Sequence, residues 1–130
     1  PHPKEFDRLA GESGGMYERH LKQIEFAKKY RVIVVLKGAH TIITLPDGRS
    51  WFNTTGNPGM ASGGSGDVLT GLIVSKLAQS YEPADAAMIA VYIHGLAADI
   101  AVDSISQPAL IAGDIIDHIG KAFLLLNKSE

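Results

Sequence analysis

Residues 57–69 read Asn-Pro-Gly-Met-Ala-Ser-Gly-Gly-Ser-Gly-Asp-Val-Leu, a glycine-rich segment that leads into an apolar run. Glycines such as Gly64 and Gly66 adopt backbone conformations closed to other residues and let a ligand approach the main-chain N–H groups. The apolar residues that follow recur at helical spacing and predict a helix over 68–79. Because the first amides of a helix are unpaired and lie at its positive end, this loop suits a phosphate group.

Asp67 stands at the predicted start of this helix. A carboxylate there repels a resting phosphate, but it can accept the proton of a hydroxyl group that attacks one. The simpler alternative is a helix cap, since Asp is a favoured N-cap residue. The loop and the carboxylate together favour phosphoryl transfer over nucleotide binding alone.

Two commoner phosphate motifs are absent. A P-loop needs Gly-Lys followed by Ser or Thr, and the only Gly-Lys pair, at Gly120, is followed by Ala122. The dinucleotide fingerprint would need a glycine at position 69, which is Leu69.

Composition narrows the class of protein. Apolar residues make up 45% of the 130-residue chain, which is enough for a core. The net charge of −2 supplies no basic surface for nucleic acid, and the absence of cysteine excludes disulfides and thiolate sites. The most apolar window, 86–98, is shorter than the ~20 residues of a membrane span, and no signal peptide is visible. We therefore expect a cytoplasmic protein without nucleic-acid or membrane partners.

The remaining patterns predict an α/β fold. Apolar spacing indicates further helices over 5–10, 16–30, 84–102 and 112–126. The β-branched and aliphatic run 32–36 is typical of a parallel strand covered on both faces. Residues Thr41–Asn53 predict a hairpin around Pro46-Asp47-Gly48. Strands first and helices after suit half of a doubly wound sheet.

The segment 57–69 is similar to the signature of the ADP- or ATP-dependent NAD(P)H-hydrate dehydratases, a family of the ribokinase-like superfamily. The resemblance extends to residues 1–6, which read Pro-His-Pro-Lys-Glu-Phe, to 36–41, Leu-Lys-Gly-Ala-His-Thr, and to 94–99, His-Gly-Leu-Ala-Ala-Asp. It covers essentially the whole chain. It implies a ribokinase-like fold, with part of a mostly parallel sheet flanked by helices. The family domain is longer, so residues 1–130 resemble the C-terminal part of one such catalytic domain.

The resemblance also implies an activity. Enzymes of this family restore hydrated NADH and NADPH at the expense of ADP or ATP, with Mg²⁺. By analogy with ribokinase-like kinases, the ring hydroxyl is phosphorylated and phosphate is then eliminated. Asp67 is the implied catalytic base and a substrate contact, and His2 is a second contact to the hydrated nicotinamide. The implied nucleotide-binding residues are Lys37, Gly38, Ala39, His40, Thr41, Gly64, Ser65 and Gly66.

Several of these residues have a simpler alternative. His2 between two prolines reads on its own as a surface histidine, and Lys37 as a solvated lysine at a strand end. His94, in the apolar segment 86–98, is interpreted as a hydrogen-bonded core histidine. Asp99 and Asp103 could hold a metal, but a solvated helix face is the preferred interpretation. We assign no metal-ligating residue.

Two other functions share part of this pattern. A small-molecule kinase of the same superfamily, for a sugar, hydroxymethylpyrimidine or pyridoxal, would share the Gly-x-Gly-Asp loop. A catalytically silent nucleotide-binding or assembly domain is the second alternative. We further expect a homo-oligomer, an epimerase domain as a possible companion in the complete protein, and no turnover by residues 1–130 alone.

Overall fold

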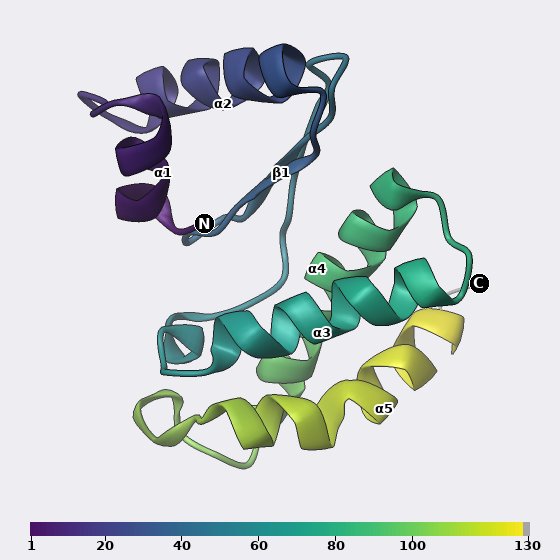
Figure 1. The fold of residues 1–130 in the computed structure, drawn as a ribbon. Helices are drawn as coiled ribbons and strands as arrows, with labels where there is room; N and C mark the ends of the chain where they lie inside the picture. The colour runs from purple at the N-terminus through teal and green to yellow at the C-terminus, as the bar shows by residue number, and fades with distance from the viewer. Residues whose placement is uncertain (129–130) are drawn as a thin grey trace. The chain divides into compact units, whose positions relative to one another are not determined.

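The computed structural model describes residues 1–128 and consists of two units. The first unit is Pro1–Asn53, and the second begins at Thr54. The first unit contains two helices and a three-stranded sheet (Figure 1). Its elements are α1 (Pro3–Ala10), α2 (Met16–Tyr30), β1 (Val34–Leu36), β2 (Ile42–Thr44) and β3 (Ser50–Phe52). The expected helix 16–30 is confirmed at both ends, and the expected helix 5–10 begins earlier, at Pro3.

The sheet has the order β1-β2-β3 and is antiparallel throughout, with Ile43 opposite both Val35 and Trp51. The hairpin is confirmed, and the Asn53 amide closes it by donating to the Thr41 carbonyl at 2.9 Å. The pairing of β1 differs from the parallel one expected. Only residues 37–41 connect β1 to β2, and a parallel pair needs a crossover of about a dozen residues or more.

The core of the first unit lies between the helices and β1. Phe6 and Ala27 are completely buried and contact Val34 and Leu36, which are nearly so. The buried Gln23 amide nitrogen donates to the carbonyl oxygens of Val34 at 3.2 Å and Ile42 at 2.9 Å. A side chain of α2 therefore ties the helix to two strands by satisfying main-chain acceptors.

The second unit consists of helices and two short 3₁₀ turns. Its elements are η1 (Pro58–Met60), α3 (Ser65–Ala78), α4 (Pro83–Ala101), η2 (Gln107–Ala109) and α5 (Ala112–Lys128). All three expected α-helices are present. The first of them begins three residues before the predicted position 68, which changes the place of Asp67.

Helix α4 is the core helix of the second unit and packs against α3 and α5 (Figure 1). Its buried residues are mostly small, with Ala86, Ala90, Ala97 and Ala98 at or near zero exposure. Among the described residues it is the one helix long and apolar enough to cross a membrane, which corrects the expectation that this segment is too short. Because 56% of its most apolar window is buried, the apolar composition of α4 is that of a core helix.

Candidate active site

Gly64 sets the geometry of the glycine-rich loop. It is the N-cap of α3 and has φ +87° and ψ −15°, in the left-handed region that costs most residues about 1–2 kcal/mol. A Cβ atom at this position would lie 3.2 Å from the Cβ of Ala112. The glycine allows the chain to turn sharply into the helix, so that α3 begins at Ser65.

The amides of this turn are only partly used within the protein. The Ser65 amide donates to the Ser62 carbonyl at 3.4 Å, and the Asp67 amide donates to the Gly64 carbonyl at 3.0 Å. Over residues 1–128, the Gly64 and Gly66 amides make no hydrogen bond. Two of the three amides implied as phosphate donors are thus available at the positive end of a helix.

Asp67 is the third residue of α3 and not its N-cap, which corrects the capping alternative. The cap is Gly64, and no side chain bonds to the helix start. The Asp67 side chain is exposed and has neither a hydrogen bond nor an ion pair within the described part of the chain. A solvent-facing carboxylate one turn or less from two free amides can accept a proton from a group that attacks a bound phosphate.

His94 contributes to the site indirectly. It is 7% exposed on α4, and its Nε2 atom lies 3.3 Å from Oγ of Ser65, which is also buried. The structure thus places it in the hydrogen-bonded core position that the sequence indicated. The Ser65 side chain is therefore engaged inside the protein.

Asp99 was missed by sequence reasoning as a contributor to this loop. Its Oδ2 atom accepts the Gly56 amide at 2.9 Å, and its Oδ1 atom accepts the Asn57 side-chain amide at 2.9 Å. The carboxylate lies neither on a solvated face nor in a metal site, because the loop before η1 occupies it. Asp103 is exposed beyond the end of α4. Within residues 1–128, no three His, Asp or Glu side chains are grouped as metal ligands.

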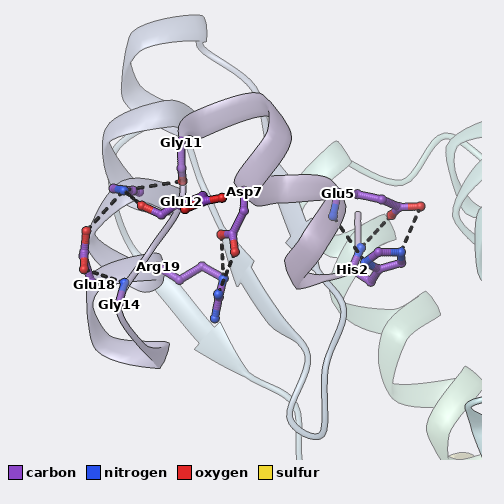
Figure 2. Close-up of polar contacts among 9 residues, drawn as sticks. His2, Glu5, Asp7, Gly11, Glu12, Gly14, Glu18 and Arg19 are labelled. Carbon is purple, nitrogen blue, oxygen red and sulfur yellow. Dashed lines mark hydrogen bonds and ion pairs between the residues drawn. The ribbon is translucent and has the colours of Figure 1, made fainter.

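His2 is the N-cap of α1, and Glu5 holds it in a capping box (Figure 2). The His2 Nδ1 atom accepts the Glu5 amide at 3.3 Å, while the Glu5 Oε2 atom accepts the His2 amide at 2.7 Å. This second bond is the main reason that the pKa of Glu5 is lowered. Because Nδ1 is an acceptor, the proton of the neutral ring lies on Nε2, 3.4 Å from Glu5 Oε1. Glu5 therefore orients a half-exposed imidazole.

Lys37 lies in the same unit as His2. Its amide donates to the Pro1 carbonyl at 2.8 Å, so the end of β1 runs beside the Pro-His-Pro segment. Gly38, Ala39 and His40 are exposed in the turn between β1 and β2, and Thr41 is partly exposed. In the described structure the Lys37 and His40 side chains make no hydrogen bond or ion pair. The first unit thus gathers His2 and the 37–41 turn, and the second gathers Asp67 and its loop.

Comparison with solved structures gives the class of protein. The chain is similar to a ribokinase-like superfamily protein from Enterococcus faecalis V583, with a TM-score of 0.74 and 31% identity over 94% of this chain and 43% of that one. The fold is therefore of the ribokinase-like α/β class.

The model of the NAD(P)H-hydrate dehydratase family matches residues 1–121, and the chain belongs to this family. It is 41% identical to the bifunctional NAD(P)H-hydrate repair enzyme Nnr of Moorella thermoacetica, over 100% of this chain and 24% of that protein. The ADP/ATP-dependent NAD(P)H-hydrate dehydratase from Bacillus subtilis, co-crystallized with ATP/Mg²⁺, superposes with a TM-score of 0.86 at 38% identity, covering 95% of this chain and 45% of that one. The chain spans a quarter to a half of these relatives.

Proposed function

We propose that this chain supplies the phosphate-binding loop and the catalytic base of an ADP- or ATP-dependent dehydratase that restores hydrated NADH and NADPH. One observation carries the proposal. The free amides of Gly64 and Gly66 and the exposed carboxylate of Asp67 share the first turn of α3. The family membership supplies the substrate class.

In the proposed reaction, Asp67 accepts the proton of the ring hydroxyl as the hydroxyl oxygen attacks the terminal phosphorus of the nucleotide. The bond from that phosphorus to its bridging oxygen breaks, and the shortened nucleotide leaves. The carbon–oxygen bond of the phosphorylated ring then breaks, phosphate leaves with the bonding pair, and the neighbouring ring carbon loses a proton. Base assistance of this kind contributes about 10²- to 10⁴-fold in rate.

The Gly64 and Gly66 amides are proposed to stabilise charge on the phosphoryl oxygens. Donors fixed in a helix turn need little reorganisation when that charge develops, which is why such donors are effective. Their directions are set by the left-handed Gly64 and by the first turn of α3.

The residues present fit a magnesium ion held chiefly by the nucleotide. Protein sites for Mg²⁺ commonly provide one or two carboxylates and leave the remaining ligands to phosphate oxygens and water. Within residues 1–128 no group of His, Asp or Glu side chains forms a protein cage for the ion, so nucleotide phosphates and water would supply its ligands and Asp67 stays free as the base. When bound, such an ion neutralises phosphate charge.

For the first unit, we propose that His2 contacts the hydrated nicotinamide and that Lys37, with the 38–41 turn, contacts the nucleotide phosphates. An imidazole oriented by Glu5 and a lysine side chain that makes no hydrogen bond or ion pair in the described structure support these assignments. We also propose that residues 1–130 form the C-terminal part of one catalytic domain. Cytoplasmic location, homo-oligomeric assembly and a companion epimerase domain stay predictions.

The test uses the complete polypeptide that contains residues 1–130. It is incubated with hydrated NADPH and ADP, and the absorbance of the restored dihydronicotinamide is followed. A dehydratase restores the absorbance only when the nucleotide is present. A stable phosphorylated product without that absorbance would instead indicate a kinase, and no reaction would indicate a silent nucleotide-binding domain.

A further inference from the structure

One side of α4 carries three residues that contact the loop leading into α3. They are His94, Gly95 and Asp99, all within the second unit. The residues of the loop that they contact begin at Thr55 and end at Ser65. Helix α4 thus contacts the stretch 55–65 at both of its ends.

At the first end, the Asp99 carboxylate makes two directed bonds. Each of its oxygens accepts one donor at 2.9 Å, the Gly56 amide on Oδ2 and the Asn57 Nδ2 atom on Oδ1. The Asn57 Oδ1 atom in turn accepts the Gly59 amide at 3.0 Å. The Asn57 side chain thus uses its nitrogen for Asp99 and its oxygen for Gly59. A flip of this amide would break both bonds, so Asp99 fixes its orientation.

Gly95 allows the loop to lie directly against the helix. A Cβ atom there would be 2.2 Å from Thr55 Oγ1 and 2.6 Å from the Thr55 carbonyl carbon. The Thr55 hydroxyl also donates to the Tyr92 carbonyl at 2.9 Å. Main-chain atoms of 55–56 therefore occupy the space that any other side chain at position 95 would need.

At the second end, the bond from His94 to Ser65 fixes the first residue of α3. His94 and Asp99 are separated by five positions on one helix, which is about 7.5 Å along the axis at 1.5 Å per residue. The segment between the two attachment points holds Gly64 and leads directly to Gly66 and Asp67. Contacts with α4 thus fix the chain before Gly64 and again at Ser65, directly before Gly66 and Asp67.

We propose that Asp99 is a positioning residue for the loop that leads into α3 and serves phosphoryl transfer, residues 56–67. Through the Gly56 amide and Asn57 it fixes the start of the segment whose far end presents the Gly64 and Gly66 amides and Asp67. The reaction that this loop serves rests on the proposed function. The positioning itself does not depend on that function, because it follows from the two hydrogen bonds of Asp99.

An exchange of the two partners tests this role. In Asp99→Asn, an amide N–H₂ group faces another donor, either Gly56 N–H or Asn57 N–H₂. In Asn57→Asp, two carboxylates face each other. In the double variant the bond returns with its direction reversed: the amide at 99 donates to the carboxylate at 57 and accepts from Gly56, while that carboxylate still accepts from Gly59.

The three variants are compared with wild type in the complete polypeptide. The readouts are ADP-dependent kcat and KM, hydrogen exchange of residues 54–67 and the melting temperature. We expect each single variant to lower kcat by roughly 10- to 100-fold, because small displacements of reacting groups are costly. We expect faster exchange in the loop, and recovery of both properties in the double variant. Asp103→Asn is the matched control: it removes a carboxylate just past the same helix that makes no hydrogen bond in the described structure.

Three results would overturn the proposal: single variants with wild-type kcat and only a lower melting temperature, a double variant no better than the singles, or loop exchange unchanged by Asp99→Asn. Should the single variants not fold, Asn57→Ser is the alternative, because Ser keeps an oxygen for the Gly59 amide but does not reach Asp99. Wild-type kcat in this variant would contradict the positioning role. Absence of turnover in the wild type would contradict the proposed function, while loop exchange would still decide the role of Asp99.

Discussion

Asp67 combines two properties that a general base at a phosphoryl-transfer site needs. Its carboxylate is exposed, and it has no protein partner within residues 1–128. Its position as the third residue of α3 follows from Gly64, whose positive φ starts the helix earlier than the apolar pattern does. Because the Asp67 side chain makes no capping hydrogen bond, its replacement by Asn breaks no hydrogen bond at the helix start.

We predict that Asp67→Asn lowers kcat by about 10²- to 10⁴-fold, because an amide cannot accept the proton at neutral pH. The dissociation constant for ADP, measured by calorimetry, should change by no more than a few-fold. Asp85→Asn is the matched control, since Asp85 is the exposed third residue of α4. Activity of Asp67→Asn near that of the control would mean that another group takes the proton.

We predict that Gly64→Ala weakens ADP binding and lowers the free energy of unfolding by about 1–2 kcal/mol. The new methyl group must adopt a left-handed conformation and meets Ala112 at 3.2 Å. Gly71→Ala provides the control, because a Cβ atom there meets nothing within 4 Å in the middle of α3. Calorimetry and chemical denaturation measure the two effects, and equal behaviour of the two variants would refute the role of Gly64.

Helices α1 and α2 are joined by a bidentate ion pair (Figure 2). The Arg19 Nε and Nη2 atoms each donate to one oxygen of Asp7 at 2.8 Å. The hydrogen bond from Arg19 is the main reason that the pKa of Asp7 is lowered. The pair joins α1, which His2 caps, to α2, which carries Gln23.

The lowered pKa of Asp7 gives a pH dependence with a defined sign. A depressed carboxyl pKa contributes stability that is complete above the unfolded value of about 3.9 and is lost as the pH falls through the lower folded value. We predict that Asp7→Asn reduces the fall in melting temperature between about pH 5 and pH 3. Asp47→Asn tests the same kind of lowered pKa in the exposed hairpin turn. The same acid sensitivity in wild type and Asp7→Asn would contradict this account.

Local patterns predicted most elements because apolar spacing is a local signal. The ends of α2, the hairpin 41–53 and the three helices of the second unit could all be read in this way. The pairing of β1 and the role of Asp99 could not. The first depends on the short link to β2, and the second on residues more than 40 positions apart that meet only after folding.

The site residues that the family resemblance implies fall into two sets. His2 and the 37–41 turn belong to the first unit, and the loop 63–67 belongs to the second. The chain covers 45% of the Bacillus subtilis structure. We propose that the segments that complete the domain in such relatives contribute walls that orient the dinucleotide and exclude water.

We therefore predict that purified residues 1–130 show no ADP-dependent turnover, since a displacement of about 1 Å can already cost a hundredfold. Large apolar side chains that are more than half exposed in both units, such as Tyr17 at 78% and Leu124 at 62%, favour self-association. Activity assays and light scattering on this fragment measure both properties. Robust turnover by a monomeric fragment would contradict the prediction.

We propose that the substrate hydroxyl itself receives the phosphoryl group beside Asp67. The most direct test uses hydrated NADPH whose ring hydroxyl carries a heavy-oxygen label, with ADP and the complete polypeptide, and mass spectrometry of the products. Phosphorylation followed by elimination transfers the labelled oxygen to the released phosphate. We predict that the label appears in phosphate, whereas label in water with unlabelled phosphate would show that the hydroxyl leaves without being phosphorylated.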